Sequence, residues 1–324
     1  MRDTFARYVE EDPRFDVRDV WVAEDVGGAL ASCVQIFPRK LAMHGKSVPT
    51  GGIGTVFTHP DRRGAGLARA ALRAAMDDIQ GRGMELGLLF AGPTGFYEPL
   101  GWRSWTVRRP LLRAPERAVA EPLAAAELFD PARDLAEVQE LHASYSRVRD
   151  GLCARDSRDW WISLRNAGNP DEDFFVSRAS GRVVAYVRAV CLARFLVFME
   201  WGRAAESAAE LAGLFAALLT PRPDDTLAPA GRPSQEFRRV ASAAPLLDEA
   251  LETELGRRDI DLAYSEDAGS MFWVANPRAL AHRFGEPYRP RDVGELEPPA
   301  ERDARLLGRI LPPGRFAFWP SDRF

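Results

Sequence analysis

The feature that most constrains the fold of this chain is a strand–loop–helix–strand unit between residues 50 and 92. The run TGGIGTVFT ends at Thr58 and is followed by the loop HPDRRGAG. Over residues 67–80 the apolar positions recur at helical spacing, and Gly81 and Gly83 are typical of a helix end. The run MELGLLFAG that follows is typical of a buried strand. This order predicts an α/β unit with a right-handed crossover.

The rest of the chain adds strands before this unit and a second set of similar elements after it. β-branched and aromatic residues dominate residues 20–58, with a hairpin signal at Gly45-Lys46. After a linker rich in Ala, Glu and Pro, the order helix, hairpin, strand and helix follows. A chain of 324 residues is also long for one domain. We therefore expect an α/β (α+β) protein with domains at 1–118 and 119–230, and an extension, 231–324, that completes the second domain.

Composition argues against several classes of protein. The net charge of −4 gives no support to nucleic-acid binding. Three cysteines far apart in the sequence and four histidines without ligand spacing indicate neither a disulfide framework nor a metal site. The most apolar run is short and is broken by Arg194, so it does not predict a membrane span. We expect a cytoplasmic protein without metal, nucleic-acid or membrane partners, and we leave a homo-oligomer open.

The loop between the predicted strand and helix has the chemistry of an anion site. Gly64 and Gly66 carry no side chain, and the first turn of a helix presents unpaired N–H groups and the positive end of its dipole. About five successive amides, from Gly64 to Ala68, are therefore placed to surround a phosphate. The spacing lacks the pattern of a P-loop, which argues against nucleotide triphosphate chemistry. A Rossmann site for NAD(P), with Glu85 as the ribose ligand, is a second interpretation of the same glycines.

The run RGAGLA at residues 63–68 resembles the R-x-x-G-x-[GA] loop of the GCN5-related N-acetyltransferases (GNAT). The preceding GTVFTHP resembles the splayed central strand of that family, and GFYEPLGW resembles its F-Y-x-x-x-G-[FWY] motif. These runs occur in the family's order within about fifty residues, and their joint occurrence makes the match specific. The resemblance implies tandem GNAT-like mixed sheets flanked by helices, with acetyl-coenzyme A as cosubstrate and no metal. The cofactor contacts that it implies are Val56, Phe57, Thr58, Arg63, Gly64, Ala65, Gly66, Leu67, Ala68 and Arg69.

Two similar halves with an extension resemble the Eis-like (enhanced intracellular survival) branch of this family, which acetylates amines. The resemblance implies that Tyr97, in the F-Y motif, protonates the departing thiolate. It also implies that the terminal carboxylate, here that of Phe324, accepts the amine proton, with the tail reaching the active site. Relative to that branch, the chain begins late and lacks much of a third, sterol-carrier-like domain. We expect acetyl transfer to a primary amine of a small molecule or a peptide.

Other interpretations of these residues stay open from the sequence. Tyr97 fits a core aromatic residue, the terminal run RFAFWPSDRF fits a last strand, and Glu98 is a rival base. The Rossmann interpretation is weakened because five residues separate the strand from the first glycine, and because Glu85 opens the next strand. A first domain that binds coenzyme A only as a regulator is a further alternative. Glu206 and Glu210 replace the glycine loop in the second half, so we expect no coenzyme A there.

Overall fold

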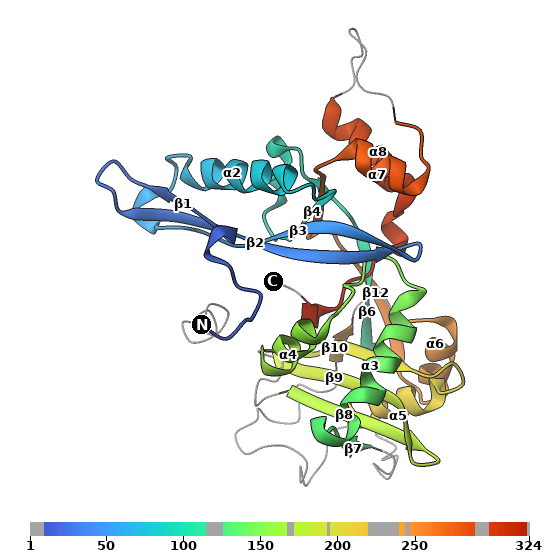
Figure 1. The fold of residues 1–324 in the computed structure, drawn as a ribbon. Coiled ribbons are helices and arrows are strands. Elements are labelled where there is room, and N and C mark those ends of the chain that lie inside the picture. Colours follow the sequence, from blue (N-terminus) through green and yellow to red (C-terminus); the bar gives the residue numbers. More distant parts are fainter. Residues whose placement is uncertain are drawn as a thin grey trace.

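Two mixed β-sheets, each covered by helices, form the frame of the protein (Figure 1). The computed structural model describes residues 10–114, 126–166, 172–192, 195–219, 240–243, 247–288 and 298–322. The predicted fold class, mixed sheets flanked by helices, is confirmed. The 3₁₀ helices that do not border the candidate site are η1 (Val17–Asp19), η7 (Pro313–Arg315) and η8 (Pro320–Asp322).

The first sheet contains the predicted strand–loop–helix–strand unit. Its six strands lie in the order β1-β2-β3-β4-β13-β5; β3 and β4 pair in parallel, and the other pairs are antiparallel. The strands are β1 (Val20–Glu24), β2 (Leu30–Met43), β3 (Lys46–Thr58), β4 (Leu86–Phe90), β5 (Arg103–Ser104) and β13 (Ser270–Val274). The hairpin predicted between β2 and β3 turns at His44 and Gly45, which both have positive φ. The helix α2 (Leu67–Gly81) joins β3 to β4.

Helices cover both faces of this sheet. Leu72 and Ile79 of α2 are fully buried, and a Cβ on Gly51 of β3 would lie 2.6 Å from the Ile79 side chain. This close approach needs glycine at position 51. On the other face, α7 (Pro277–Phe284) and α8 (Pro299–Ile310) pack in one cluster with Leu86 and Leu88 of β4. The strand β4 is apolar throughout because it is buried on both sides.

The second sheet repeats the same plan in seven strands. Its order, β7-β8-β9-β10-β11-β6-β12, matches the first sheet strand for strand after β7. The pair β10 and β11 is parallel, and α5 lies between them in the chain as α2 lies between β3 and β4. The strands are β6 (Val107–Arg113), β7 (Glu127–Leu128), β8 (Glu172–Ala179), β9 (Arg182–Leu192), β10 (Phe195–Arg203), β11 (Val240–Ala243) and β12 (Asp261–Asp267). The helices are α3 (Pro131–Arg147), α4 (Ser157–Asn166), α5 (Ala208–Leu219) and α6 (Glu249–Gly256).

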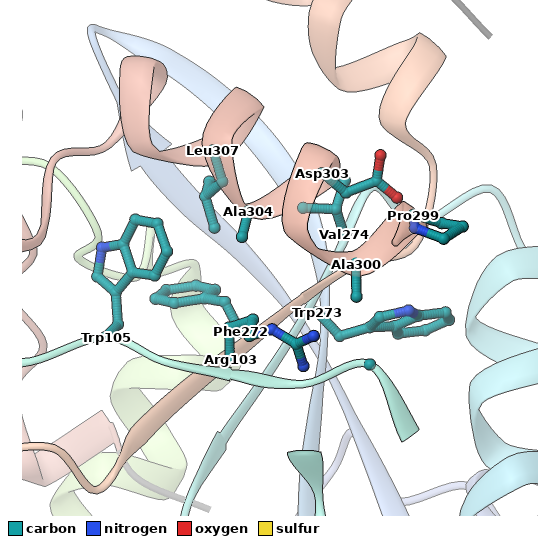
Figure 2. A pocket seen from close by; sticks show the side chains of 11 residues that line it. Arg103, Trp105, Phe272, Trp273, Val274, Pro299, Ala300, Asp303, Ala304 and Leu307 are labelled. Carbon is teal, nitrogen blue, oxygen red and sulfur yellow. The ribbon is translucent and has the colours of Figure 1, made fainter. Parts of the chain in front are cut away.

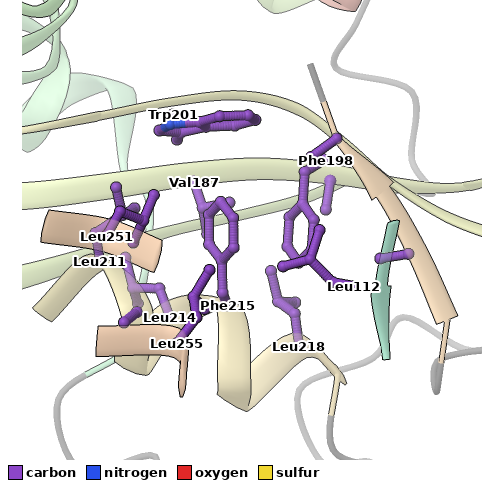
Figure 3. Close-up of a cluster of buried hydrophobic side chains, with 14 of the residues drawn as sticks. Leu112, Val187, Phe198, Trp201, Leu211, Leu214, Phe215, Leu218, Leu251 and Leu255 are labelled. Carbon is purple, nitrogen blue, oxygen red and sulfur yellow. The ribbon is translucent and has the colours of Figure 1, made fainter. Parts of the chain in front are cut away.

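The core of the second half lies between its sheet and the helices α5 and α6. Phe215 of α5 stacks on Phe198 of β10 with ring centroids 4.0 Å apart, and Trp201 meets Phe215 edge-on (Figure 3). Leu211, Leu214 and Leu218 of α5 are buried in the same cluster. Their spacing of three and four residues is the stripe that the sequence shows.

The two sheets exchange one strand each. The strand β6 follows β5 in the chain but pairs with β11 and β12, whereas β13 follows β12 but lies between β4 and β5. The two segments that cross between the sheets, before β6 and before β13, lie side by side. The main-chain N–H of Trp105 donates to the main-chain carbonyl of Ser270 over 2.7 Å. We expected residues 231–324 to complete the second domain; β11 and β12 both pair with β6 in the second sheet, but β13 belongs to the first sheet. Each sheet therefore contains a strand from the other half of the chain.

The C-terminal run, residues 316–322, is not the last strand that its apolar residues suggested. It forms one isolated bridge, with Asp150, and then a 3₁₀ turn. Its side chains alternate between the two cores: Phe316 and Phe318 pack in the first half, and Ala317 and Trp319 in the second. The run is apolar because both of its sides are buried between the halves.

Candidate active site

The parallel strands β3 and β4 separate from each other in the middle of the first sheet. They pair as far as Ile53, opposite Leu89, and β3 then continues to Thr58. On the β2 side the pairing continues past a bulge that includes Thr55, whose φ is 52°. A bulge bends its strand and redirects the residues that follow it. Among the described strands, none pairs with the β4 side of β3 beyond Ile53.

The three residues predicted from the splayed strand lie beyond this bulge. Val56 packs toward α2, whereas the Phe57 side chain is 52% exposed. The Ser32 hydroxyl donates to the carbonyl of Phe57 over 2.7 Å and lies 3.0 Å from the Thr58 hydroxyl. These bonds hold the end of β3 to β2. Its other edge, together with the Phe57 ring, is left accessible.

The loop after β3 contains two glycines in the left-handed region of backbone conformation. Gly64 has φ 83° and Gly66 has φ 78°, values that glycine adopts readily and other residues adopt only with strain. Apart from chain neighbours, no atom lies within 4 Å of a Cβ built on either glycine. The loop therefore has open space directly beside its backbone.

The first turn of α2 is not capped by the rest of the described chain. Gly66 is the N-cap residue and offers no side-chain hydrogen bond. From Gly64 to Arg69, no main-chain N–H donates a hydrogen bond to a described residue, and the first to do so is that of Ala70. Free N–H groups at the positive end of a helix dipole are suited to bind an anion.

Two of the arginines beside this loop are free to meet an anion. The Nε of Arg62, at the end of η2 (Pro60–Arg62), lies 2.9 Å from Asp25 in the turn between β1 and β2, and this ion pair fixes the loop to that turn. Arg63 and Arg69 are exposed and form no ion pair with a described residue.

Tyr97 lies between the short helices η3 (Thr94–Phe96) and η4 (Glu98–Leu100) that follow β4. Its ring is 9% exposed, meets the Phe96 ring edge-on at 4.9 Å, and belongs to the cluster that contains Ile53. Its hydroxyl forms no hydrogen bond with a described residue, and the oxygen is not fully buried. Burial raises the pKa of Tyr97. The ring is thus held by the core while its hydroxyl, protonated at neutral pH, reaches solvent.

The remaining candidates from the sequence have other surroundings. Glu85 lies just before β4, and both of its carboxylate oxygens bind the Nε of Arg283, at 3.0 and 2.9 Å. The Glu85 carboxylate is thus paired with Arg283 and is not available to bind a ribose. The first sheet is also mixed, whereas a Rossmann fold has a mostly parallel sheet, so the Rossmann interpretation is wrong. Glu98 is exposed. Phe324 lies outside the described residues.

In the second sheet, β10 has a bulge at the place that corresponds to the Thr55 bulge of β3, and a buried charged cluster lies beside it. The strands β10 and β11 pair from Leu196 to Phe198 over the described part of β11, and a bulge in β10 separates Phe198 from Glu200. The Glu200 carboxylate is fully buried and accepts a 2.6 Å bond from Arg155. Although burial opposes ionisation, the charges of Arg155 and Arg188 hold the pKa of Glu200 well below its usual range. A buried charged cluster therefore lies beside the bulge of β10.

The start of α5 also differs from that of α2. Glu206 lies two residues before α5 begins at Ala208, and Glu210 lies in its first turn. Carboxylates at this end of a helix oppose the binding of an anion. They stand where the first half has its glycine loop.

Sequence reasoning missed the residues of β2 that face the splayed part of β3. Ser32 and Cys33 lie opposite Thr58 and Phe57, and the Cys33 thiol donates to the carbonyl of Thr55 over 3.4 Å. Burial raises the pKa of this thiol. The signal that could have found them is the register of the hairpin counted back from its turn, although the bulge shifts that count by one residue.

A separate cavity of about 190 Å³ lies between β13 and α8 (Figure 2). Aromatic rings and α8 side chains line it: Trp105, Phe272, Trp273, Ala300, Ala304 and Leu307. At its rim the Asp303 carboxylate accepts a 3.1 Å bond from the hydroxyl of Tyr288. None of the predicted site residues lines this cavity.

Two further findings concern the described part of the chain. No helix there combines the length and the apolar composition that crossing a membrane requires. The same residues contain no group of three or more His, Cys, Asp or Glu side chains arranged to hold a metal ion.

A family model described as an acetyltransferase (GNAT) domain matches residues 1–104. A search of curated proteins finds no match. The alignment with a GCN5-related N-acetyltransferase from Anabaena variabilis has a TM-score of 0.60 at 15% identity and covers 81% of this chain and 64% of that one. The alignment with Eis1 from Mycobacterium abscessus has a TM-score of 0.56 at 20% identity and covers 86% of this chain and 71% of that one.

These likenesses extend over both halves of the chain, although the chain spans only about two thirds of the length of the solved structures that it matches. The open edge of β3, the glycine loop and Tyr97 all lie within the segment that the family model matches. Residues 1–104 therefore match a GNAT acetyltransferase domain, and the chain has the tandem, two-sheet fold of the GNAT and Eis structures that it resembles.

Proposed function

We propose that the protein is an acetyl-coenzyme A-dependent N-acetyltransferase that acts on a primary amine. The observation that carries the proposal is the open backbone edge of β3 beside an uncapped, glycine-containing helix start. Both lie in a segment that matches an acetyltransferase domain. Acetyl-coenzyme A would supply the acetyl group as a thioester, from which the acceptor amine displaces the thiolate.

The residues of the first half fit the two ends of this cosubstrate. The N–H groups of residues 64–69 and the side chains of Arg63 and Arg69 would hold the diphosphate, since charge-assisted hydrogen bonds to such donors are strong. The edge of β3 at Val56, Phe57 and Thr58 would pair with the amide groups of the pantetheine arm, as a strand edge pairs with a peptide. Main-chain N–H groups there would also face the carbonyl oxygen that gains negative charge during transfer.

Proton movements account for the proposed roles of Tyr97 and Phe324. Acyl transfer needs a neutral amine, whereas an alkylammonium group with a pKa near 10 is mostly charged at pH 7. The ammonium group therefore loses one proton before it attacks, which the terminal carboxylate of Phe324 would accept, and the nitrogen loses a second proton as the amide forms, which would replace the one that Tyr97 gives up. The thiolate that leaves gains one proton, which the Tyr97 hydroxyl would donate, because burial keeps this group protonated. The products are an amide and a free thiol.

Thiol release tests the proposal directly. The purified full chain is incubated with acetyl-coenzyme A and a panel of primary amines, and free thiol is followed with time. We expect amine-dependent release; binding of the cofactor without it would instead support a regulatory coenzyme A module.

Tyr97→Phe tests the acid. It should lower kcat about 100-fold, the usual contribution of a general acid, with coenzyme A affinity within a factor of two. Tyr264→Phe, on β12 of the second sheet, is the matched control and should leave both unchanged. A collapse of coenzyme A affinity in Tyr97→Phe would make Tyr97 a structural residue.

A further inference from the structure

The cavity between β13 and α8 contains none of the residues proposed to act in acetyl transfer, yet it has the features of a binding site. Its volume is about 190 Å³, and every residue that lines it belongs to the described part of the chain. The rings of Trp105 and Phe272 form one wall, edge-on to each other with centroids 5.7 Å apart, and both residues are buried. Ala300 and Ala304 of α8 line the opposite side (Figure 2). These short side chains leave the space open.

The size and the walls of this cavity fit one aromatic ring with a short chain attached. An apolar cavity of about 150 Å³ stays dry and binds benzene, so this larger space has room for a ring and roughly two or three further heavy atoms. Phe272 and Leu307, which are almost fully buried, offer such a ring apolar contacts from both sides of the cavity. Its burial would be favourable without any polar contact.

Arg103 of β5 also lines the cavity, but its charge is already compensated. Its Nε and Nη2 lie 2.9 and 2.8 Å from the Glu301 carboxylate, and its Nη1 donates to the main-chain carbonyls of Glu98 and Trp102. All three nitrogens therefore have acceptors within the protein, and Arg103 does not need an anionic ligand. The group can still offer its flat face, on which an aromatic ring stacks favourably.

Asp303, at the rim of the cavity, has a carboxylate that is less well compensated. Its Oδ1 accepts a 3.1 Å bond from the Tyr288 hydroxyl and a long one, 3.4 Å, from the Nε of Arg302. Its Oδ2 accepts no hydrogen bond from a described residue. The side chain is only 17% exposed, and burial raises the pKa of Asp303. A cation placed beside Oδ2 would therefore gain a charge-assisted hydrogen bond.

We propose that this cavity binds a small primary amine that carries one aromatic ring, with the ring against Phe272 and Arg103 and the ammonium group beside Asp303. The apolar walls accept the ring, and the acid at the rim selects a cation over neutral or anionic molecules of the same shape. The inference does not rest on the proposed function, because binding here requires neither coenzyme A nor acetyl transfer.

Three molecules of similar shape test the proposal: phenethylamine, phenethyl alcohol and phenylpropionate, which are cationic, neutral and anionic at pH 7. Each is titrated calorimetrically into the full chain without coenzyme A. The amine should bind about tenfold more tightly than the alcohol, which is the effect of one charge-assisted hydrogen bond. The anion should bind more weakly than the alcohol, because it would lie beside the Asp303 carboxylate.

Two variants place the binding in this cavity. Ala304→Leu fills the space and should weaken the binding of the amine and of the alcohol more than tenfold. Asp303→Asn can still accept the bond from Tyr288, and it should bring the Kd of the amine within a factor of two of that of the alcohol. Ala209→Leu, at an exposed position of α5, is the matched control and should leave all three Kd values unchanged. Saturating amine should raise the Tm of the wild type and of this control, but not that of Ala304→Leu.

Equal Kd values for the amine in the wild type and in Ala304→Leu would overturn the inference, because the amine would then bind elsewhere. A wild-type chain that binds the alcohol or the anion as tightly as the amine, or that binds none of the three, would overturn it as well. If Ala304→Leu does not fold, Ala300→Leu, which enters the same cavity one turn earlier in α8, is held to the same outcomes. None of these titrations measures thiol release, so their failure is distinguishable from a failure of the proposed function.

Discussion

Gly66→Ala separates the role of the glycine loop in binding from its role in folding. Gly66 is the N-cap residue of α2 with φ 78°, and no atom beyond its chain neighbours lies within 4 Å of a Cβ built there. The substitution therefore displaces no protein atom. Its two effects are backbone strain and a methyl group in the open space where we propose that the diphosphate binds.

Both effects have magnitudes that the geometry sets. An alanine in the left-handed region costs roughly 1 kcal/mol. Divided by the unfolding entropy of a chain of this length, this cost corresponds to a decrease in Tm of about 1–2 °C. Keeping an anion away from one or two N–H donors loses about 1.5–3 kcal/mol for each charge-assisted bond, or roughly 10- to 100-fold in Kd.

Gly181→Ala is the matched control, because Gly181 has φ 81° and equal space around its Cβ but lies in the β8–β9 hairpin of the second half. Calorimetric titration of coenzyme A and a thermal melt are carried out on both variants. We expect equal small losses of Tm and a weaker Kd in Gly66→Ala alone. Equal, wild-type Kd values in both variants would refute the reasoning that the diphosphate contacts this backbone.

Four further predictions follow from the structure. Because burial raises the pKa of Tyr97, a kcat–pH profile should show no loss of the acid below about pH 10. Burial lowers the pKa of His142 from 6.5 to about 3, so the free energy of unfolding should fall by up to roughly 5 kcal/mol as the pH drops through this range. In His142→Leu, the free energy of unfolding measured with urea should depend less on pH over the same range. Gly151→Ala places a Cβ 2.5 Å from the Phe316 ring and should destabilise the chain by about 2–3 kcal/mol in denaturant titrations. Residues 1–118 expressed alone should elute as aggregates in size-exclusion chromatography, because β4 loses its neighbour β13 and the helices α7 and α8 that pack on it.

The strand–loop–helix–strand unit could be predicted because all of its signals are local. The stripe of Leu72, Met76 and Ile79 specifies the helix, and Gly64 and Gly66 mark a loop that no side chain fills. The bulge at Thr55 gave no such signal, since a threonine with positive φ looks like any strand residue in the sequence. The open edge of β3 therefore came from the structure and not from the pattern.

Strand pairing between the halves could not be predicted, because a strand's own sequence does not say which edge it joins. The run MFWV predicts a buried strand equally well in either sheet, and only the crossing at Ser270 beside Trp105 decides for the first. The prediction of a last strand in the terminal run was wrong for a related reason. Its residues look like a strand because both sides are buried, yet the apolar partners of Phe318 and Trp319 lie in different cores.

The two halves share one fold but differ in what surrounds the bulge of the central strand. Both have a bulge in one strand of the central parallel pair, at Thr55 in β3 and after Phe198 in β10. In the first, the helix start beyond the bulge is uncapped and has open space beside it; in the second, Glu200 fills the place with Arg155 and the chain's own tail. A buried charge needs a partner, so moving the C-terminal run away from β10 would leave charges of the Glu200, Arg155 and Asp322 cluster unpaired. The exchanged strands β6 and β13 join this half to the sheet in which we propose that the reaction occurs, so the two halves are held together as one folded unit.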